Sequence, residues 1–171
     1  MARKIRGSLV TELFGTVVTV AAAVGAGVTG GVYFTFATIV SPALRLRSAP
    51  EAVAVMQRVN EKALRPPFMI VFFGGALAAC AAAVIAMFPG DSAGIVPVRL
   101  IGAGLTVASF VTTILSNVPR NNALARIRPS EWDAADAWRS FDAGWSRANT
   151  TRAVLAITGS AFLASSLAIR L

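Results

Sequence analysis

Between two long apolar runs lies the stretch Asn117–Arg152, which reads NVPRNNALARIRPSEWDAADAWRSFDAGWSRANTTR. It holds all three tryptophans of the protein and four of its five asparagines: Trp132, Trp138, Trp145, Asn117, Asn121, Asn122 and Asn149. Because apolar runs flank it on both sides, its polar groups must be held against a membrane. This is where we expect any specific site.

The composition defines the class of protein. Hydrophobic residues make up 56% of the 171 residues and charged residues only 14%, whereas soluble domains carry about 25% charged residues. The length suits a single domain, residues 1–171. The net charge of +8 does not indicate nucleic-acid binding, because the basic residues flank apolar runs, as they do in membrane proteins.

The chain has no histidine and one cysteine, Cys80. An intramolecular disulfide is therefore impossible, and haem held by histidine, zinc held by cysteine and histidine, and catalytic triads with histidine are excluded. The eight carboxylates show no metal-ligand spacing. We expect no cofactor and no metal.

Four apolar runs are long enough to cross a bilayer, for which about 20 residues are needed. Pro42 and Pro119 are expected to end the first and third runs, because proline lacks the N–H that a helix interior needs. The expected fold class is an all-α integral membrane protein, a four-transmembrane-helix bundle with spans over about residues 13–40, 67–88, 96–118 and 152–170.

The first run follows a basic start, MARKIR, as the apolar region of a signal peptide does. Such regions are roughly 7–15 residues long, but this run continues to about Val40. We therefore interpret it as a retained span of a multi-pass protein of the cell (inner) membrane.

With four spans, both termini lie on one side and two long loops, 43–65 and 119–152, lie on the other. Each loop is expected to carry a short interfacial helix, over about residues 50–64 and 131–147. The loops together hold 11 of the 16 Lys and Arg residues, which favours a cytoplasmic location for them. The basic N-terminus favours the opposite orientation, so both remain open.

Gly27 and Gly31 form a GxxxG pair in the first span. Small residues at this spacing allow two helices to approach closely. The pair serves either homo-oligomerisation or packing against another helix of the same chain.

The unusual polar residues converge on the long-loop side: Gln57, Asn60, Arg65, Asn117, Asn121, Asn149 and Arg152. Gln57 and Asn60 either bond to the backbone of the bundle or line a site. The whole set either ties the loops to the bundle or closes a pocket for a flat lipophilic molecule. The spans have no acid or base at mid-membrane depth, which argues against a pump or coupled transporter.

Several short pieces in order resemble a family of small four-span membrane proteins that includes the fungal anthrone oxygenases. The pieces are Gly31…Phe34, Pro42-Ala43-Leu44, Met56-Gln57-Arg58-Val59-Asn60, Pro67-Phe68-Met69, Asn117-Val118-Pro119-Arg120-Asn121 and Trp145-Ser146-Arg147-Ala148-Asn149-Thr150-Thr151-Arg152. The last resembles a W-x-x-x-N-x-x-R signature. Family members often carry a histidine just after the asparagine, where this chain has Thr150.

The resemblance implies oxygenation of an anthrone to an anthraquinone without metal or flavin. A base removes the acidic ring proton, and donors stabilise the resulting oxyanion in a dry pocket. Arg152 and Asn149 are the candidate oxyanion donors, and Asp142 is the candidate base. The expected substrate-binding residues are Gln57, Asn60, Asn117, Asn121, Trp138 and Trp145, with the two tryptophans stacking on the polycycle.

Three interpretations remain open. The first is a cofactor-independent oxygenase acting on a lipophilic polycyclic or quinone-like molecule. The second is a non-catalytic binding or accessory protein on the same scaffold, and the third is a structural oligomeric protein. The partners expected are membrane lipid and a lipophilic small molecule, with a homo-oligomer as a further alternative and no nucleic acid.

Overall fold

The computed structural model describes residues 2–88, 94–128 and 134–169, with side chains from residue 11 onward. Every element in these ranges is helical and none is a strand. Four helical segments are long and apolar enough to cross a membrane: Thr11–Arg45, Pro66–Ala86, Ile95–Leu124 and Ala134–Ala168. The all-α four-span architecture is therefore confirmed.

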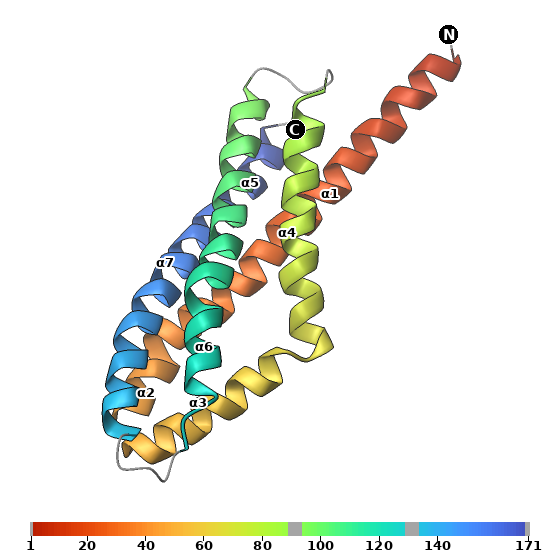
Figure 1. Cartoon of the computed structure of the whole chain (residues 1–171). Helices are drawn as coiled ribbons and strands as arrows, with labels where there is room; N and C mark the ends of the chain where they lie inside the picture. The colour runs from red at the N-terminus through yellow and green to blue at the C-terminus, as the bar shows by residue number, and fades with distance from the viewer. Residues whose placement is uncertain (1, 89–93, 129–133, 170–171) are drawn as a thin grey trace.

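The elements follow one another with few irregular residues. In chain order they are α1 (Ala2–Thr35), η1 (Phe36–Val40), α2 (Ser41–Arg45), α3 (Ala49–Ala63), α4 (Pro66–Ala86), α5 (Ile95–Thr112), η2 (Thr113–Asn117), α6 (Val118–Leu124) and α7 (Ala134–Ala168), where η1 and η2 are π-helical turns. α1 packs against α4 and α7, and α5 packs against the same two helices. The N- and C-terminal ends lie at the end of the bundle where α4 connects to α5, and α2 and α3 lie at the opposite end (Figure 1).

The first and third spans do not end at their prolines, contrary to expectation. Each helix continues for a further turn or more, to Arg45 and Leu124, after a π-helical turn. In these turns the N–H of Ser41 bonds the carbonyl of Phe36, and that of Val118 bonds Thr113. A widened turn accommodates the proline ring and its missing N–H, which an ordinary α-helical turn does not.

The last two predicted helices are also one. The interfacial helix expected over 131–147 and the span expected over 152–170 belong to the single helix α7, and residues 131–133 and 170–171 lie outside the described part. Nothing between Arg147 and Arg152 breaks the helix. Thr150 and Thr151 turn their hydroxyls back onto the carbonyls of Ser146 and Arg147, which lets polar side chains remain in a helix.

The helix α3 crosses the long-loop end of the bundle (Figure 1), close to the range expected for it. A capping box sets its start: Ser48 and Glu51 satisfy each other's backbone N–H groups, and Pro50 lies in the first turn. The hydrogen bonds from the Ser48 side chain and backbone hold the pKa of the Glu51 carboxyl below its ordinary value of 4.5.

Small residues pack the half of the bundle that includes the α4–α5 connection, which we call the short-connection half. A Cβ on Gly25 of α1 would lie 2.6 Å from the Cα of Gly75 of α4, and one on Gly102 of α5 would lie 2.8 Å from the backbone of Leu163 of α7. The buried cluster around them is mostly alanine. Backbones approach this closely only where side chains are small.

The GxxxG pair separates into two environments. Gly27 lies within the chain's own bundle, where a Cβ would meet the hydroxyl of Ser160 at 3.1 Å, whereas a Cβ on Gly31 would have nothing within 4 Å. Gly27 therefore serves packing against another helix of the same chain, whereas Gly31 makes no close helix contact with the described residues.

Candidate functional site

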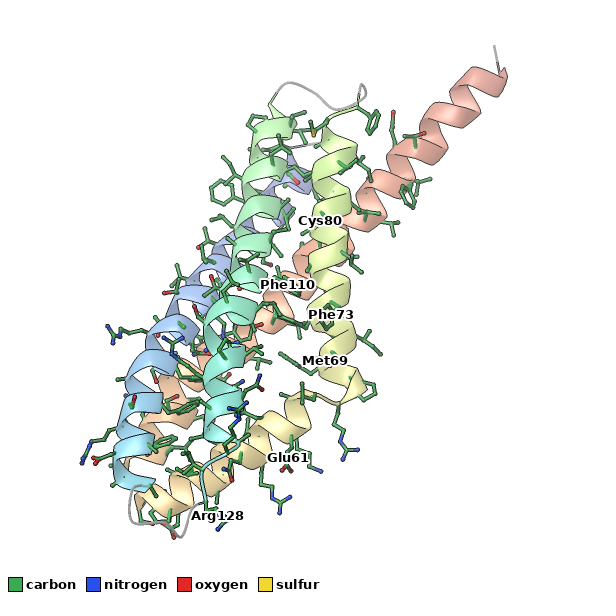
Figure 2. All side chains as sticks on the ribbon, in the orientation of Figure 1. Glu61, Met69, Phe73, Cys80, Phe110 and Arg128 are labelled. Carbon is green, nitrogen blue, oxygen red and sulfur yellow. The ribbon has the colours of Figure 1, made fainter. Side chains whose placement is uncertain are left out.

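A cavity of about 700 Å³ occupies the long-loop half of the bundle, under α3. Most of its lining is apolar, and Met69 reaches from α4 toward the space between α4 and α6 (Figure 2). We call it the Arg152 cavity. Its lining residues are Val32, Tyr33, Phe36, Ala54, Val55, Met56, Arg58, Val59, Asn60, Lys62, Ala63, Leu64, Phe68, Met69, Phe72, Thr113, Val118, Asn121, Trp145 and Arg152.

Arg152 of α7 is the buried charge in this lining, with 7% of its surface exposed. Its Nη2 donates to the Oδ1 of Asn149 at 3.0 Å, and its Nη1 donates to the hydroxyl of Thr113 at 3.4 Å. The guanidinium lies over the ring of Tyr33, 4.0 Å from the centroid, and 5.3 Å from that of Trp145. The candidate oxyanion donors Arg152 and Asn149 are thus brought together.

The charge of Arg152 has neutral neighbours. Among the described residues, its hydrogen-bond acceptors are an amide and a hydroxyl, and no carboxylate forms an ion pair with it. Buried charges are usually paired, because desolvation is costly. Aromatic faces recover part of that cost. A cation held in this way can stabilise a negative charge that develops on a molecule in the cavity.

Asn60 supplies an unpaired donor beside the buried charge of Arg152. It lines the cavity from α3, and its Nδ2 is buried with no hydrogen-bond partner in the described part of the chain. A buried donor without an acceptor is uncommon and requires an explanation. A polar atom of a bound molecule would satisfy it, so Asn60 fits the site alternative of the two that its position left open.

Three further asparagines brace the wall of the cavity. Asn149 donates to the carbonyl of Tyr33 at 2.9 Å, and Asn117 donates to the carbonyl of Trp145 at 3.3 Å. Asn121 accepts the indole N–H of Trp145 at 2.8 Å. Asn117 and Asn149 are wholly buried. These amides fix Tyr33 and Trp145, the rings on either side of the Arg152 guanidinium.

Five expected site residues lie outside the lining: Asn117 and Asn149, whose amides bond the backbone of its wall, and Gln57, Trp138 and Asp142. Gln57 donates to the carbonyls of Leu124 and Ile127 at 2.9 and 2.8 Å. Of its two expected roles, it therefore bonds to the backbone and does not line the site. Trp138 packs in the core below α3 and stacks on Phe141.

Asp142, the expected base, is held in an ion pair. Its carboxylate accepts the Nε of Arg45 at 2.6 Å and the hydroxyl of Ser146 at 2.8 Å. It does not line the Arg152 cavity. Its contacts connect α7 to α2 and give it a structural partner.

Tyr33 and Thr113 are site residues that the sequence reading missed. Tyr33 is the only tyrosine of the chain, and this rarity within an apolar span was the available signal. Thr113 is one of several hydroxyl residues on its helix and nothing local distinguishes it. It contacts Arg152 because it begins η2, the π-helical turn before Pro119.

The donor set offers little to a metal. No group of three or more Asp, Glu, Cys or His side chains that could hold an ion occurs within the described ranges. The cavity instead offers mainly apolar walls, the rings of Tyr33 and Trp145 beside one buried cation, Arg152, and the unpaired amide donor of Asn60.

Fold and cavity together define a multi-pass membrane protein with a lipophilic pocket built around a buried arginine. The family model described as Anthrone oxygenase matches residues 68–162, more than half of the chain. The chain therefore belongs to this family and is a membrane oxygenase-like protein, which confirms the resemblance. Comparison with curated proteins and with solved structures gave no match.

The match covers part of the cavity. It includes Thr113 and Arg152 of the lining, and Asn149 beside them, but begins at residue 68, after Tyr33 and Asn60. The family match therefore covers the side of the cavity that carries Arg152. The sides formed by α1 and α3 are known only from the structure of this chain.

Proposed function

We propose that the protein is a cofactor-independent oxygenase that binds a lipophilic polycyclic aromatic or quinone-like molecule in the Arg152 cavity. The observation that carries the proposal is the buried Arg152, which has no carboxylate partner among the described residues and faces an apolar cavity. The proposed location is the cell (inner) membrane, from which such a molecule would enter directly.

The proposed reaction replaces a CH₂ group of the substrate by a carbonyl. The substrate loses a proton to give a carbanion whose charge lies largely on its carbonyl oxygen. One electron passes to O₂, the two radicals combine, and water leaves, so that substrate and O₂ give a quinone and water. In this scheme Arg152 and Asn60 donate hydrogen bonds to the oxyanion.

The proton acceptor need not be a carboxylate of the lining. Stabilisation of the anion by Arg152 lowers the free energy of the deprotonated substrate, so that water at the mouth of the cavity can accept the proton. Asp142 would have to leave Arg45 before acting as a base.

A non-catalytic binding protein is the second candidate. It is favoured by one observation: no aspartate or glutamate is present among the described residues that line the cavity. Binding without turnover would then be the whole function, with the same recognition of an anionic or strongly polarised oxygen.

The test uses the full chain in lipid nanodiscs, supplied with an anthrone. We expect O₂ uptake and quinone absorbance above the rate in empty nanodiscs. Val59→Trp fills the cavity from α3 and should abolish both. Val84→Trp is the matched control, because Val84 is exposed on α4 outside the lining.

The outcomes separate the two candidates. Quenching of tryptophan fluorescence by the anthrone without O₂ uptake would replace the oxygenase by the binding protein. Neither binding nor uptake, or equal loss in both valine variants, would overturn the assignment of the cavity for this class of substrate.

A further inference from the structure

A second hollow lies on the outside of the bundle between α6 and α7. It has a volume of about 590 Å³ and contains two arginines, Arg120 and Arg147. We call it the α6–α7 cleft. Its lining consists of Arg120, Ala123, Leu124, Ile127, Ala137, Ser140, Phe141, Ala143, Gly144 and Arg147. We propose that this cleft binds the phosphate headgroup of an anionic phospholipid.

In the part of the chain that the structure describes, the hydrogen-bond acceptors of the two cleft arginines are backbone carbonyls. Arg120 donates to the carbonyl of Ser116 at 2.6 Å, and Arg147 donates to that of Ala143 at 3.1 Å. Within the described part of the chain, neither forms an ion pair with a carboxylate. Each guanidinium has five N–H donors, so most of them remain available to a phosphate, the anion that arginine binds in a bidentate manner.

Neighbouring arginines differ in this respect. Arg45 pairs with Asp142, Arg58 with Glu61 and Arg139 with Asp136. At the same end of the molecule, carboxylates thus pair with three arginines outside the cleft, whereas no carboxylate of the described residues pairs with the two inside it. Charge complementarity therefore selects an anion as the occupant.

Gly144 shapes the cleft around Arg120. A Cβ at this position would lie 2.6 Å from the Nε of Arg120 and 3.3 Å from its Nη2. The Arg120 side chain therefore lies directly against α7 at Gly144, and a Cβ there would force it to shift.

A mainly apolar hollow continues from the cleft along α7. It shares Arg147 and is lined by Ser146, Arg147, Thr150, Thr151, Val154 and Leu155. From Arg147 to Leu155 the helix rises by about 12 Å, away from the loop end and into the span. A headgroup held by Arg147 would therefore lay an acyl chain against Val154, which is 59% exposed. This continuity identifies a lipid as the occupant.

The depth of the cleft fits this ligand. Arg120 lies near the end of the span Ile95–Leu124, where basic side chains meet headgroups. A net anionic headgroup is favoured over a zwitterionic one, because each nearby basic residue contributes about fivefold to binding at an anionic surface. The inference does not depend on the proposed oxygenase activity.

The test is a lipid titration of the purified full chain in a neutral detergent, followed by native mass spectrometry. Phosphatidylglycerol, phosphatidylcholine and inorganic phosphate are the three probes. We expect phosphatidylglycerol to bind most tightly. In Arg120→Gln/Arg147→Gln its affinity should fall roughly 30-fold, the product of two basic residues. Arg65→Gln/Arg126→Gln removes the same charge from exposed positions outside the cleft that, among the described residues, also form no ion pair, and it should bind nearly as well as wild type.

Three outcomes would overturn the proposal. Equal losses in the two double variants would reduce the effect to surface charge. Binding of inorganic phosphate as tight as that of phosphatidylglycerol would identify a free-anion site. If the cleft variant does not fold, wild type alone decides: no preference for phosphatidylglycerol over phosphatidylcholine would exclude a specific anionic-lipid site.

Discussion

The two halves of the bundle are built from the same helices but differ in how closely those helices approach. In the short-connection half, Gly25 meets Gly75 and Gly102 meets α7 with backbone in contact with backbone. In the long-loop half, large aromatic residues and the crossing helix α3 separate the helices, and a cavity of about 700 Å³ remains.

The difference follows from residue size and from two prolines. Where both faces carry glycine or alanine, helices approach until backbones touch. Where Trp145, Phe141 and Met56 form the core, they cannot, and the π-helical turns before Pro42 and Pro119 interrupt the regular surface further. Packing in one half thus holds the bundle together while the other half is free to carry chemistry.

The largest expected effect tests the long-loop half, which contains the Arg152 cavity. Arg152→Met should lower the rate of oxygenation by about 10²–10³-fold, the usual loss on removing an oxyanion donor. Its effect on the melting temperature should be small, because the desolvation cost of the buried charge is removed while the buried Oδ1 of Asn149 loses its donor.

Stopped-flow or O₂-electrode rates and thermal melts of the same preparation check this. The matched control is Arg139→Met, an exposed arginine on the same helix. A strongly destabilised variant with an unchanged turnover rate would assign Arg152 to packing. The two halves would then not differ in role.

The next effect tests the closely packed short-connection half. Gly25→Ala should destabilise the protein by about 1–3 kcal/mol, as overpacking does, because the new Cβ would lie 2.6 Å from the Cα of Gly75. Gly74→Ala is the control, since a Cβ there would meet nothing within 4 Å. Denaturation in a mild detergent measures both. Equal stability of the two variants would mean that the halves are packed alike.

A smaller effect tests whether Asn60, in the long-loop half, binds the ligand through its amide. Asn60→Leu should weaken binding of an anionic ligand by about tenfold, because one hydrogen bond to a charged group is lost. A neutral ligand of similar shape should bind about as before, since leucine fills a similar volume. Isothermal titration with the two ligands distinguishes the cases, and a parallel loss for both would assign Asn60 to shape alone.

The smallest effect concerns the start of α3. The pKa of Glu51 is lowered by its bonds from Ser48, so its stabilisation is present above the ordinary value of 4.5 and is lost as the pH falls through the lower folded-state pKa. Proteolysis of the α3 region should therefore accelerate in acid. Glu51→Gln should remove this acid dependence, and a variant that keeps it would show that another group titrates.

Local rules of sequence were sufficient for much of the fold. The apolar runs predicted four spans, and the loop 43–65 was expected to carry a helix over about residues 50–64, where α3 lies. The prolines misled, since whether Pro42 and Pro119 end a helix or widen it into a π turn depends on what packs around them. α7 was divided in two for a similar reason: polarity around Asn149 suggested a break that the helix backbone does not have.

The site was predictable where it depended on short spacing and not where it depended on tertiary contact. Asn149 and Arg152 lie three residues apart on one helix, and their pairing follows from that. Tyr33 contacts Arg152 from a segment more than a hundred residues away in the chain. No local sequence pattern predicts this contact. The pairing of Asp142 with Arg45 is equally remote, and it takes the expected base out of the lining.

The unbroken course of α7 has a mechanical consequence. Asp142, which is tied to α2, Arg147 in the α6–α7 cleft and Arg152 in the cavity all lie on one rod without a hinge. The ten residues from Asp142 to Arg152 span about 15 Å, so an axial slide or rotation of this rod displaces all three at once. Whatever holds the rod at one of these positions therefore sets its register at the other two.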